Sequence, residues 1–308
     1  NITPAISVEG FQKETDVRRG EGTFDKILRA FENLKSVGVP FGISITGTKH
    51  NAELVVSDEF MDYYFDEMGA MYGWIFQYMP IGRSHTLDLM VTPEQRLMMW
   101  KKERELINNG LFIADFWNCG TVSDGCISAG KDGNGYLYID WNGNVFPCVF
   151  NPYYTHNIVE IYQNGGDLNT ALFTPLMETI REWHHGYILD RPPDKVGNIL
   201  RQCAIRDHFG MMRRIIELNN AKGADEAAEE ALIDEDYYTG LVAYGERVEE
   251  LTKDIWDEEY LAPERERMLK EQQSLSETPP DETPQIDASI LHAVKQKVGS
   301  VANRLWLK

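Results

Sequence analysis

Four cysteines are the residues of this sequence with the clearest capacity for metal chemistry. Cys119, Cys126, Cys148 and Cys203 lie in the middle of a 308-residue chain and are separated by 6, 21 and 54 residues. Four thiolates can hold either a [4Fe–4S] cluster or a structural zinc ion. The intervals lack the paired Cys-x2-Cys knuckles of zinc ribbons, which favours iron–sulfur but leaves zinc open. Four unrelated buried cysteines are the third alternative.

A β-hairpin is predicted next to the third cysteine. Two strand-like runs, Tyr136–Trp141 and Asn144–Cys148, flank the dipeptide Asn142-Gly143. This dipeptide is typical of a two-residue hairpin turn. Pro147 lacks a backbone donor and helps to end the second strand. We therefore expect Cys148 to sit on a rigid support.

The first 110 residues alternate short apolar runs with amphipathic stretches, as in a parallel α/β structure. Strands are expected at Ile6–Gly10, Phe41–Thr46 and Trp74–Met79, with helices at Phe24–Val37, after Ser57 and after Thr92. The segment Thr92-Pro93-Glu94-Gln95 has the residues of a capping box. Polar residues at the carboxyl ends of such strands are candidates for binding small molecules.

The rest of the chain divides by composition. Residues 111–210 are rich in turns and cysteines and predict a separate, ligand-organised domain. Residues 211–277 predict acidic helices, 278–288 a proline-rich linker and 289–308 a basic amphipathic helix. That last helix could lie on an anionic membrane surface, dock on a partner, or pack on its own protein.

The charge and the termini limit the function further. The net charge is -19, and Lys222–Asp287 alone holds 21 acidic and 6 basic residues. Such a field repels phosphate backbones, so we expect no general nucleic-acid partner. The sequence has no signal peptide and no apolar run of roughly 18 residues, which predicts a cytoplasmic protein. Because the first residue is Asn1 rather than Met, we expect the natural start to be missing.

Several segments together resemble the radical S-adenosylmethionine (SAM) superfamily. Ile6–Gly10 and Asp16–Phe24 look like a middle barrel strand and the helix that follows it. Cys119–Cys148 is similar to the SPASM or twitch auxiliary-cluster domain, and Cys203–His208 resembles its late cysteine motif. The resemblance implies an α/β fold: a partial radical SAM (β/α) barrel over 1–110, a small α+β iron–sulfur domain over 111–210, and a helical C-terminal extension.

The resemblance also implies cofactors and roles. An auxiliary [4Fe–4S] cluster would bind Cys119, Cys126, Cys148 and Cys203. SAM would lie near the carboxyl ends of the strands, beside Glu9, Arg18, Arg19, Ser44, Asn51 and Tyr78. Glu9 would accept from the amino group of SAM, one of the two arginines would pair with its carboxylate, and Ser44 or Asn51 would approach the ribose.

The expected partners are an electron donor such as flavodoxin or ferredoxin and a substrate that is a peptide, a small metabolite or a lipid. The Cys-x3-Cys-x2-Cys motif that binds the SAM-cleaving cluster is absent from this sequence. We expect it in a preceding segment together with a second [4Fe–4S] cluster, so this chain alone should not cleave SAM. The alternatives are a degenerate homologue, or a non-catalytic binding module stabilised by zinc or iron–sulfur.

Four histidines fall within the expected auxiliary domain: His156, His184, His185 and His208. They could tune a cluster or move protons, but surface or capping roles are the simpler interpretation.

Overall fold

The computed structural model describes residues 2–133 and 135–277, which fall into two compact units that divide after Ala262. The expected linker 278–288 and basic helix 289–308 lie outside the described residues. The strands are β1 Ala5–Val8, β2 Gly42–Gly47, β3 Gly73–Gln77, β4 Ile113–Asp115, β5 Tyr138–Ile139, β6 Asn144–Phe146, β7 Tyr153–Tyr154, β8 His156–Asn157 and β9 Lys222–Gly223.

Helices connect these strands and form most of the second half of the chain. The α-helices are α1 Gln12–Arg19, α2 Thr23–Ser36, α3 Asp58–Met61, α4 Pro93–Asn108, α5 Ile158–Gln163, α6 Leu168–Leu172, α7 Pro175–His184, α8 Ala204–Asp207, α9 Phe209–Leu218, α10 Glu226–Ile233, α11 Glu235–Trp256 and α12 Ala262–Glu277. Single turns of 3-10 or π-helix are η1 Leu54–Val56, η2 Asp62–Glu67, η3 Ser128–Gly133, η4 His185–Leu189, η5 Pro193–Lys195 and η6 Asp257–Leu261.

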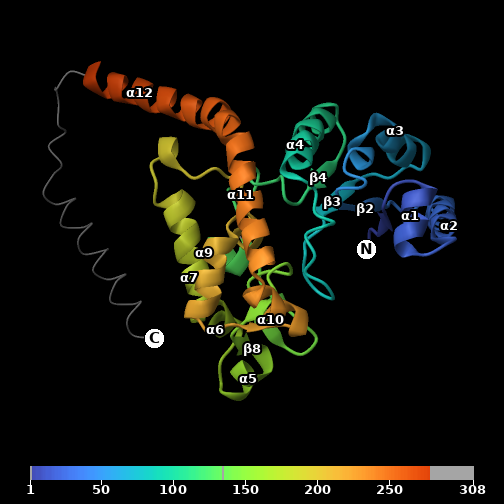
Figure 1. The fold of residues 1–308 in the computed structure, drawn as a ribbon. Coiled ribbons are helices and arrows are strands. Elements are labelled where there is room, and N and C mark those ends of the chain that lie inside the picture. The colour runs from blue at the N-terminus through green and yellow to red at the C-terminus, as the bar shows by residue number, and fades with distance from the viewer. Residues whose placement is uncertain (1, 134, 278–308) are drawn as a thin grey trace, which may run out of the picture. The chain divides into compact units, whose positions relative to one another are not determined.

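The N-terminal part is built around a four-stranded parallel sheet in the order β1-β2-β3-β4 (Figure 1). All three expected strands are present, and the expected α/β class with a parallel sheet is confirmed. The sheet extends past residue 110, because Ile113–Asp115 still pairs with β3. Division of the first unit at residues 110 and 210 stays a prediction.

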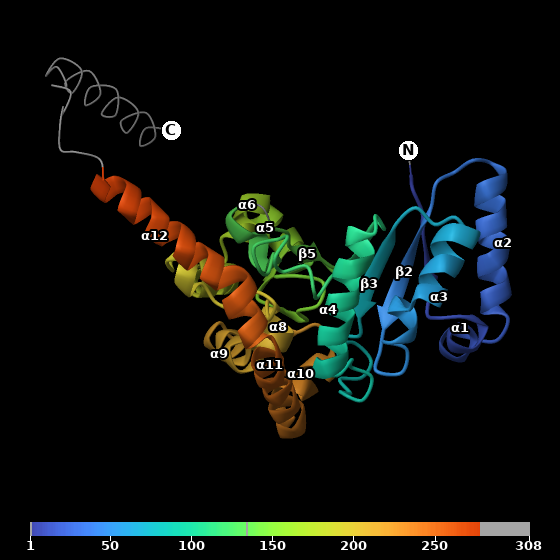
Figure 2. The ribbon, with the colours of Figure 1, turned by 90° about the horizontal axis from the view of Figure 1, so that it is seen from above.

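One face of this sheet forms a hydrophobic core with α2, α3 and α4, which flank the strands in Figure 2. Its strand residues include Val8, Ile43, Ile45 and Ile75, all nearly inaccessible to solvent. Neighbouring residues on a strand point to opposite faces, so Ser44 and its partner Trp74 belong to the other face. Trp74 is 40% exposed there.

Local sequence signals define two helix starts as expected. The Ser57 hydroxyl accepts from the backbone N–H of Phe60, and Thr92 forms the predicted capping box with Gln95. The apolar pattern did not predict helix α1, because Gln12–Arg19 is strongly polar and buries only Thr15, whereas the family resemblance had placed a helix in the overlapping segment Asp16–Phe24. It adds a fourth helix to the first 110 residues.

The expected hairpin is present, but its turn is longer than predicted. Strands β5 and β6 are antiparallel, with Ile139 opposite Val145. The N–H of Gly143 donates to the carbonyl of Asp140 at 3.0 Å, and Gly143 has φ 86°. A three-residue loop with glycine in the left-handed region replaces the two-residue turn. The hairpin continues into a third strand, β8.

Helices dominate the described residues after 203. The longest, α11, packs against α4 from the first half of the chain and against α8 and α9. The short strand β9 was not expected, and it pairs with β7. Within residues 2–133 and 135–277, every helix is too short or too polar to traverse a bilayer.

Candidate metal centre

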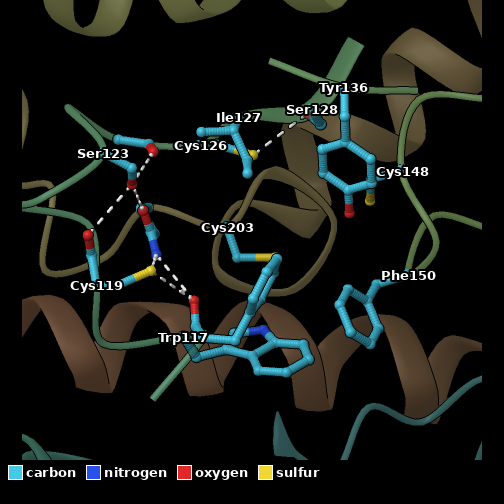
Figure 3. A pocket seen from close by; sticks show the side chains of 13 residues that line it. Trp117, Cys119, Ser123, Cys126, Ile127, Ser128, Tyr136, Cys148, Phe150 and Cys203 are labelled. Carbon is cyan, nitrogen blue, oxygen red and sulfur yellow. Dashed lines mark hydrogen bonds between the residues drawn. The ribbon is translucent and has the colours of Figure 1, made fainter. Parts of the chain in front are cut away.

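All four cysteines line one cavity, which Figure 3 shows from close by. Cys119 and Cys126 lie in the loop between β4 and η3, Cys148 directly follows the hairpin, and Cys203 immediately precedes α8. None of them is in a disulfide. Nine further residues complete the lining: Phe116, Trp117, Ser123, Gly125, Ile127, Ser128, Tyr136, Phe150 and Gln202. The fold thus collects thiols from three distant parts of the sequence.

The thiols differ in the groups that act on them. Cys126 and Cys203 are both near enough to Cys148 for their charges to raise its pKa. Cys119 instead donates to the carbonyl of Phe116 at 3.2 Å, and Gln202 Nε2 lies 3.9 Å from its sulfur. Among the described residues, no three His, Cys, Asp or Glu side chains are arranged to hold a metal ion. The donor set therefore fits a four-thiolate centre in chemistry and location, while its sulfurs are not gathered into a coordination shell.

The thiols differ in how readily they lose a proton. Burial raises the pKa of Cys148, and burial followed by the nearby Asp207 raises that of Cys203 to about 12. Burial also acts on Cys126, but hydrogen bonding and charge from the adjacent His184, followed by hydrogen bonding at Ser128, outweigh it and lower its pKa to about 7. Because the thiolate is the metal-binding form, Cys126 is the first ligand this cavity can offer at neutral pH.

A buried charge cluster lies behind the cavity, and we use that name for Arg96, Glu103, Asp115, Arg206 and Asp207. Each of the five is at most 5% exposed. Asp207 Oδ1 accepts from Arg96 Nη1 at 2.7 Å and from Arg206 Nε at 3.0 Å. The cluster therefore joins α4 and β4, at the sheet, to α8 beside Cys203.

This cluster holds the cysteine segment by its backbone. Asp207 Oδ2 accepts from the N–H of Cys203 at 3.0 Å. Arg96 Nη2 donates to the carbonyls of Trp117 and Leu200, each at 2.9 Å. Buried hydrogen bonds to charged groups are among the stronger ones in proteins. The geometry of Cys203 relative to the sheet is thus fixed by charge pairing, in addition to apolar packing.

Gln77, at the carboxyl end of β3, contacts two members of the buried charge cluster. Gln77 Nε2 donates to Asp115 Oδ2 at 2.7 Å, and Gln77 Oε1 accepts from Arg206 at 3.2 Å. Sequence reasoning did not single out these residues. The available signal was that Gln77 and Asp115 are polar residues at the carboxyl ends of apolar strands.

Glu103 of α4 and Asp115 of β4 carry one negative charge between them. Burial, followed by the charge of Asp115, raises the pKa of Glu103 to about 8. Burial also raises the pKa of Asp115, but Gln77, the Trp117 N–H and Arg96 favour its charged form. We therefore assign the proton to Glu103 near neutral pH. The cluster then contains two cations and two anions, a balance that buried charges require.

A second site lies at the carboxyl ends of β1 and β2. Glu9 is 1% exposed and pairs with Arg19 at 2.6 Å and with Arg18 at 3.2 Å. Burial is the largest influence on Glu9 and raises its pKa despite both arginines. Nine residues line a cleft of about 360 Å³ here: Glu9, Lys13, Glu14, Val17, Arg18, Thr48, His50, Asn51 and Leu89. Its volume is within the range of small-molecule sites.

The other expected SAM contacts are Asn51, Tyr78 and Ser44, and not all of them lie where they were expected. Asn51 is committed to backbone groups: its Nδ2 donates to the carbonyls of Glu9 and Thr46, and its Oδ1 accepts from the Thr48 N–H. Tyr78 directly follows β3, as expected. Ser44 lies within β2 rather than at its carboxyl end, so its expected position was wrong.

Two curated proteins are similar to this chain. Mycofactocin maturase MftC of Mycolicibacterium smegmatis is 29% identical over 220 residues, which cover 68% of this chain and 50% of the relative. The AdoMet-dependent heme synthase of Methanosarcina barkeri is 24% identical over 182 residues, covering 51% of this chain and 50% of the relative. Both similarities support the resemblance of this chain to the radical SAM superfamily. The resemblance inferred from its sequence is confirmed at that level.

The chain spans half the length of the curated relatives it matches. No family model matches it. Among solved structures, native anSMEcpe with bound AdoMet is 14% identical, with a TM-score of 0.47 and coverage of 81% of this chain and 66% of that one. SuiB of Streptococcus suis is 16% identical, with a TM-score of 0.42 and coverage of 59% and 45%.

Proposed function

We propose that this chain is part of a radical SAM enzyme and that its four cysteines bind an auxiliary [4Fe–4S] cluster. The observation that carries the proposal is the convergence of Cys119, Cys126, Cys148 and Cys203 on one cavity from three separate segments. Four unrelated cysteines have no reason to share a cavity, and iron–sulfur ligation supplies one. In this proposal residues 111–210 are the SPASM/twitch-like domain and residues 1–110 belong to the SAM-binding barrel.

We further propose that all four thiols ligate the cluster, so that it relays electrons instead of binding substrate at an open iron. The buried charge cluster supports this choice, since it holds the backbone of Cys203 at the cavity through Asp207. A cysteine that did not ligate the iron–sulfur cluster would not require such a fixed backbone position.

The cleft at Glu9 is our candidate for the amino-acid end of SAM. That end carries an ammonium and a carboxylate, and the Glu9 pair with Arg18 and Arg19 presents one anion beside two cations. When bound, SAM and its cluster would supply the radical chemistry; the chain's own residues would orient the ligand by exchanging these ion pairs. Asn51 would keep the ends of the two strands in place through its backbone bonds.

The remaining partners follow from the family. The complete enzyme would carry a Cys-x3-Cys-x2-Cys motif, bind a second [4Fe–4S] cluster and receive electrons from flavodoxin or ferredoxin. The relatives are named for mycofactocin and heme, which are unrelated products. Their names select none of the three substrate classes: peptide, small metabolite or lipid. A cytoplasmic location stays a prediction.

Replacing each cysteine singly by alanine tests the ligand set. The chain is purified without oxygen, reconstituted with iron and sulfide, and assayed for iron per chain and for its iron–sulfur absorption. We expect every variant to lose bound iron, whereas Ser123→Ala, which alters the same cavity without removing a thiol, should not. Full iron in Cys203→Ala would refute the closed cluster, and full iron in all four variants would refute the cluster itself.

A further inference from the structure

His184 is a buried histidine without a hydrogen-bonding partner. It is the last residue of α7, its exposure is 2%, and neither of its ring nitrogens makes a hydrogen bond. Leaving such a group unsatisfied in the interior is energetically costly. Unpaired buried polar groups are rare enough in native proteins to require an explanation.

The side chain is placed beside the second cysteine. Helix α7 packs against η3, the turn that begins two residues after Cys126. Arg181 Nη1 donates to the carbonyl of Ala129 at 2.7 Å, so this face of α7 is turned toward that segment. His184 lies three residues further along the same helical face. The ring is near enough to Cys126 for hydrogen bonding and charge to favour the thiolate, although neither ring nitrogen meets hydrogen-bond geometry with the sulfur as the chain stands.

Two other histidines of this region already have partners. His208 Nε2 lies 2.9 Å from the carbonyl of Arg201, and its ring contacts the rings of both Trp183 and Tyr187. His156 is exposed and contacts the hydroxyl of Thr155. His184 therefore differs from both in having buried nitrogens that are not used by the protein as it stands.

We propose that His184 is a positioning residue for the cluster, with a ring N–H that donates a hydrogen bond to the sulfur of Cys126 once that sulfur is a metal-bound thiolate. The inference rests on the proposed cluster and adds a residue that tunes it. A metal-bound thiolate is a permanent acceptor in a site that otherwise offers the imidazole none. Hydrogen bonds to cluster sulfurs stabilise the more negative, reduced state and so raise the reduction potential.

The test measures the reduction potential and the electron paramagnetic resonance signal of the reconstituted chain. His184→Leu removes the donor at similar volume, and His184→Gln keeps an N–H in reach. We expect the potential to fall in the leucine variant and to stay near the wild-type value in the glutamine variant, with iron content unchanged in both. His156→Leu, on exposed β8, is the matched control and should leave the potential unchanged. If His184→Leu does not fold, His184→Met also removes the donor, and its reduction potential is measured instead.

The outcomes separate this inference from the proposed function. A wild-type chain that binds no cluster overturns both. A wild-type cluster whose potential and resonance signal are the same in the apolar variants overturns the role of His184 alone. Loss of iron from His184→Leu to the extent seen in Cys126→Ala would show that His184 is a ligand or a structural residue, and would also overturn the hydrogen-bond proposal.

Discussion

Replacing Asp207 by asparagine removes the negative charge at the centre of the buried charge cluster while keeping the shape of the side chain. Asp207 is 1% exposed and accepts from two guanidinium groups and from the backbone of Cys203. Without it, Arg96 and Arg206 remain buried as cations, and Arg206 already has one N–H without a partner. Removing one member of a buried ion pair costs about 3–5 kcal/mol, because the remaining charge is uncompensated.

We therefore expect Asp207→Asn to lower the free energy of unfolding by about 3–5 kcal/mol. In a unit of this size each kcal/mol lowers the melting temperature by roughly 2–4 °C, so the shift should be on the order of 10 °C. Urea and thermal unfolding followed by circular dichroism measure both quantities. Glu94→Gln is the control, since it breaks an ion pair to Arg247 at 2.8 Å whose side chains are 56% and 47% exposed. Such a surface pair contributes about 0–1 kcal/mol.

The pH dependence of the stability difference between wild type and Asp207→Asn is an independent check on the role of the Asp207 charge. Burial alone would raise the pKa of Asp207, but Arg96 and Arg206 outweigh it and hold the pKa well below its usual range. The stability from this charge is fully present above the unfolded-state pKa of about 3.9 and is lost as the pH falls below it. The difference between wild type and Asp207→Asn should therefore shrink in acid. A variant within 1 kcal/mol of wild type at pH 7 would refute the reasoning, as would no recovery in the double variant Asp207→Asn/Arg206→Met.

Two further substitutions test other parts of the account. Burial and the charge of Asp115 raise the pKa of Glu103 to about 8, so the wild type should lose stability as the pH rises from about 4.3 toward 8, and Glu103→Gln should not. Parallel urea titrations across that range check this, and a constant difference between the two proteins would contradict it. Gly120→Ala should lower the iron retained after reconstitution, because its new Cβ would run into the carbonyl oxygen of Ile199 and displace the neighbouring Cys119. Iron content equal to wild type would show that the loop adapts.

Much of the local structure could be predicted because its causes are local. The capping box at Thr92 depends on residues within one turn of helix, and the parallel strands are marked by their own apolar runs. Helix α1 was missed because Gln12–Arg19 has no apolar stripe to reveal it. The hairpin was predicted with too short a turn because Asn142-Gly143 also suits a longer loop, and the backbone of Asp140 decides between them.

The cysteines of the candidate site could be predicted from the sequence, but the residues that hold them in place could not. Cysteines are chemically conspicuous, so all four were found from the sequence. The buried charge cluster was not, because Arg96 and Asp207 are 111 residues apart and nothing local marks them as partners. The ion pairs of Glu9 with Arg18 and Arg19 were not predicted either. All three residues were expected to contact a ligand, but in the structure they pair with one another.

The most direct test of the central claim is the iron, acid-labile sulfide and zinc content of this chain purified without oxygen. Four-thiolate ligation of a [4Fe–4S] cluster predicts about four irons and four sulfides per chain, bound through the four cysteines. One zinc and no sulfide would contradict it and would indicate a metal-stabilised binding module instead.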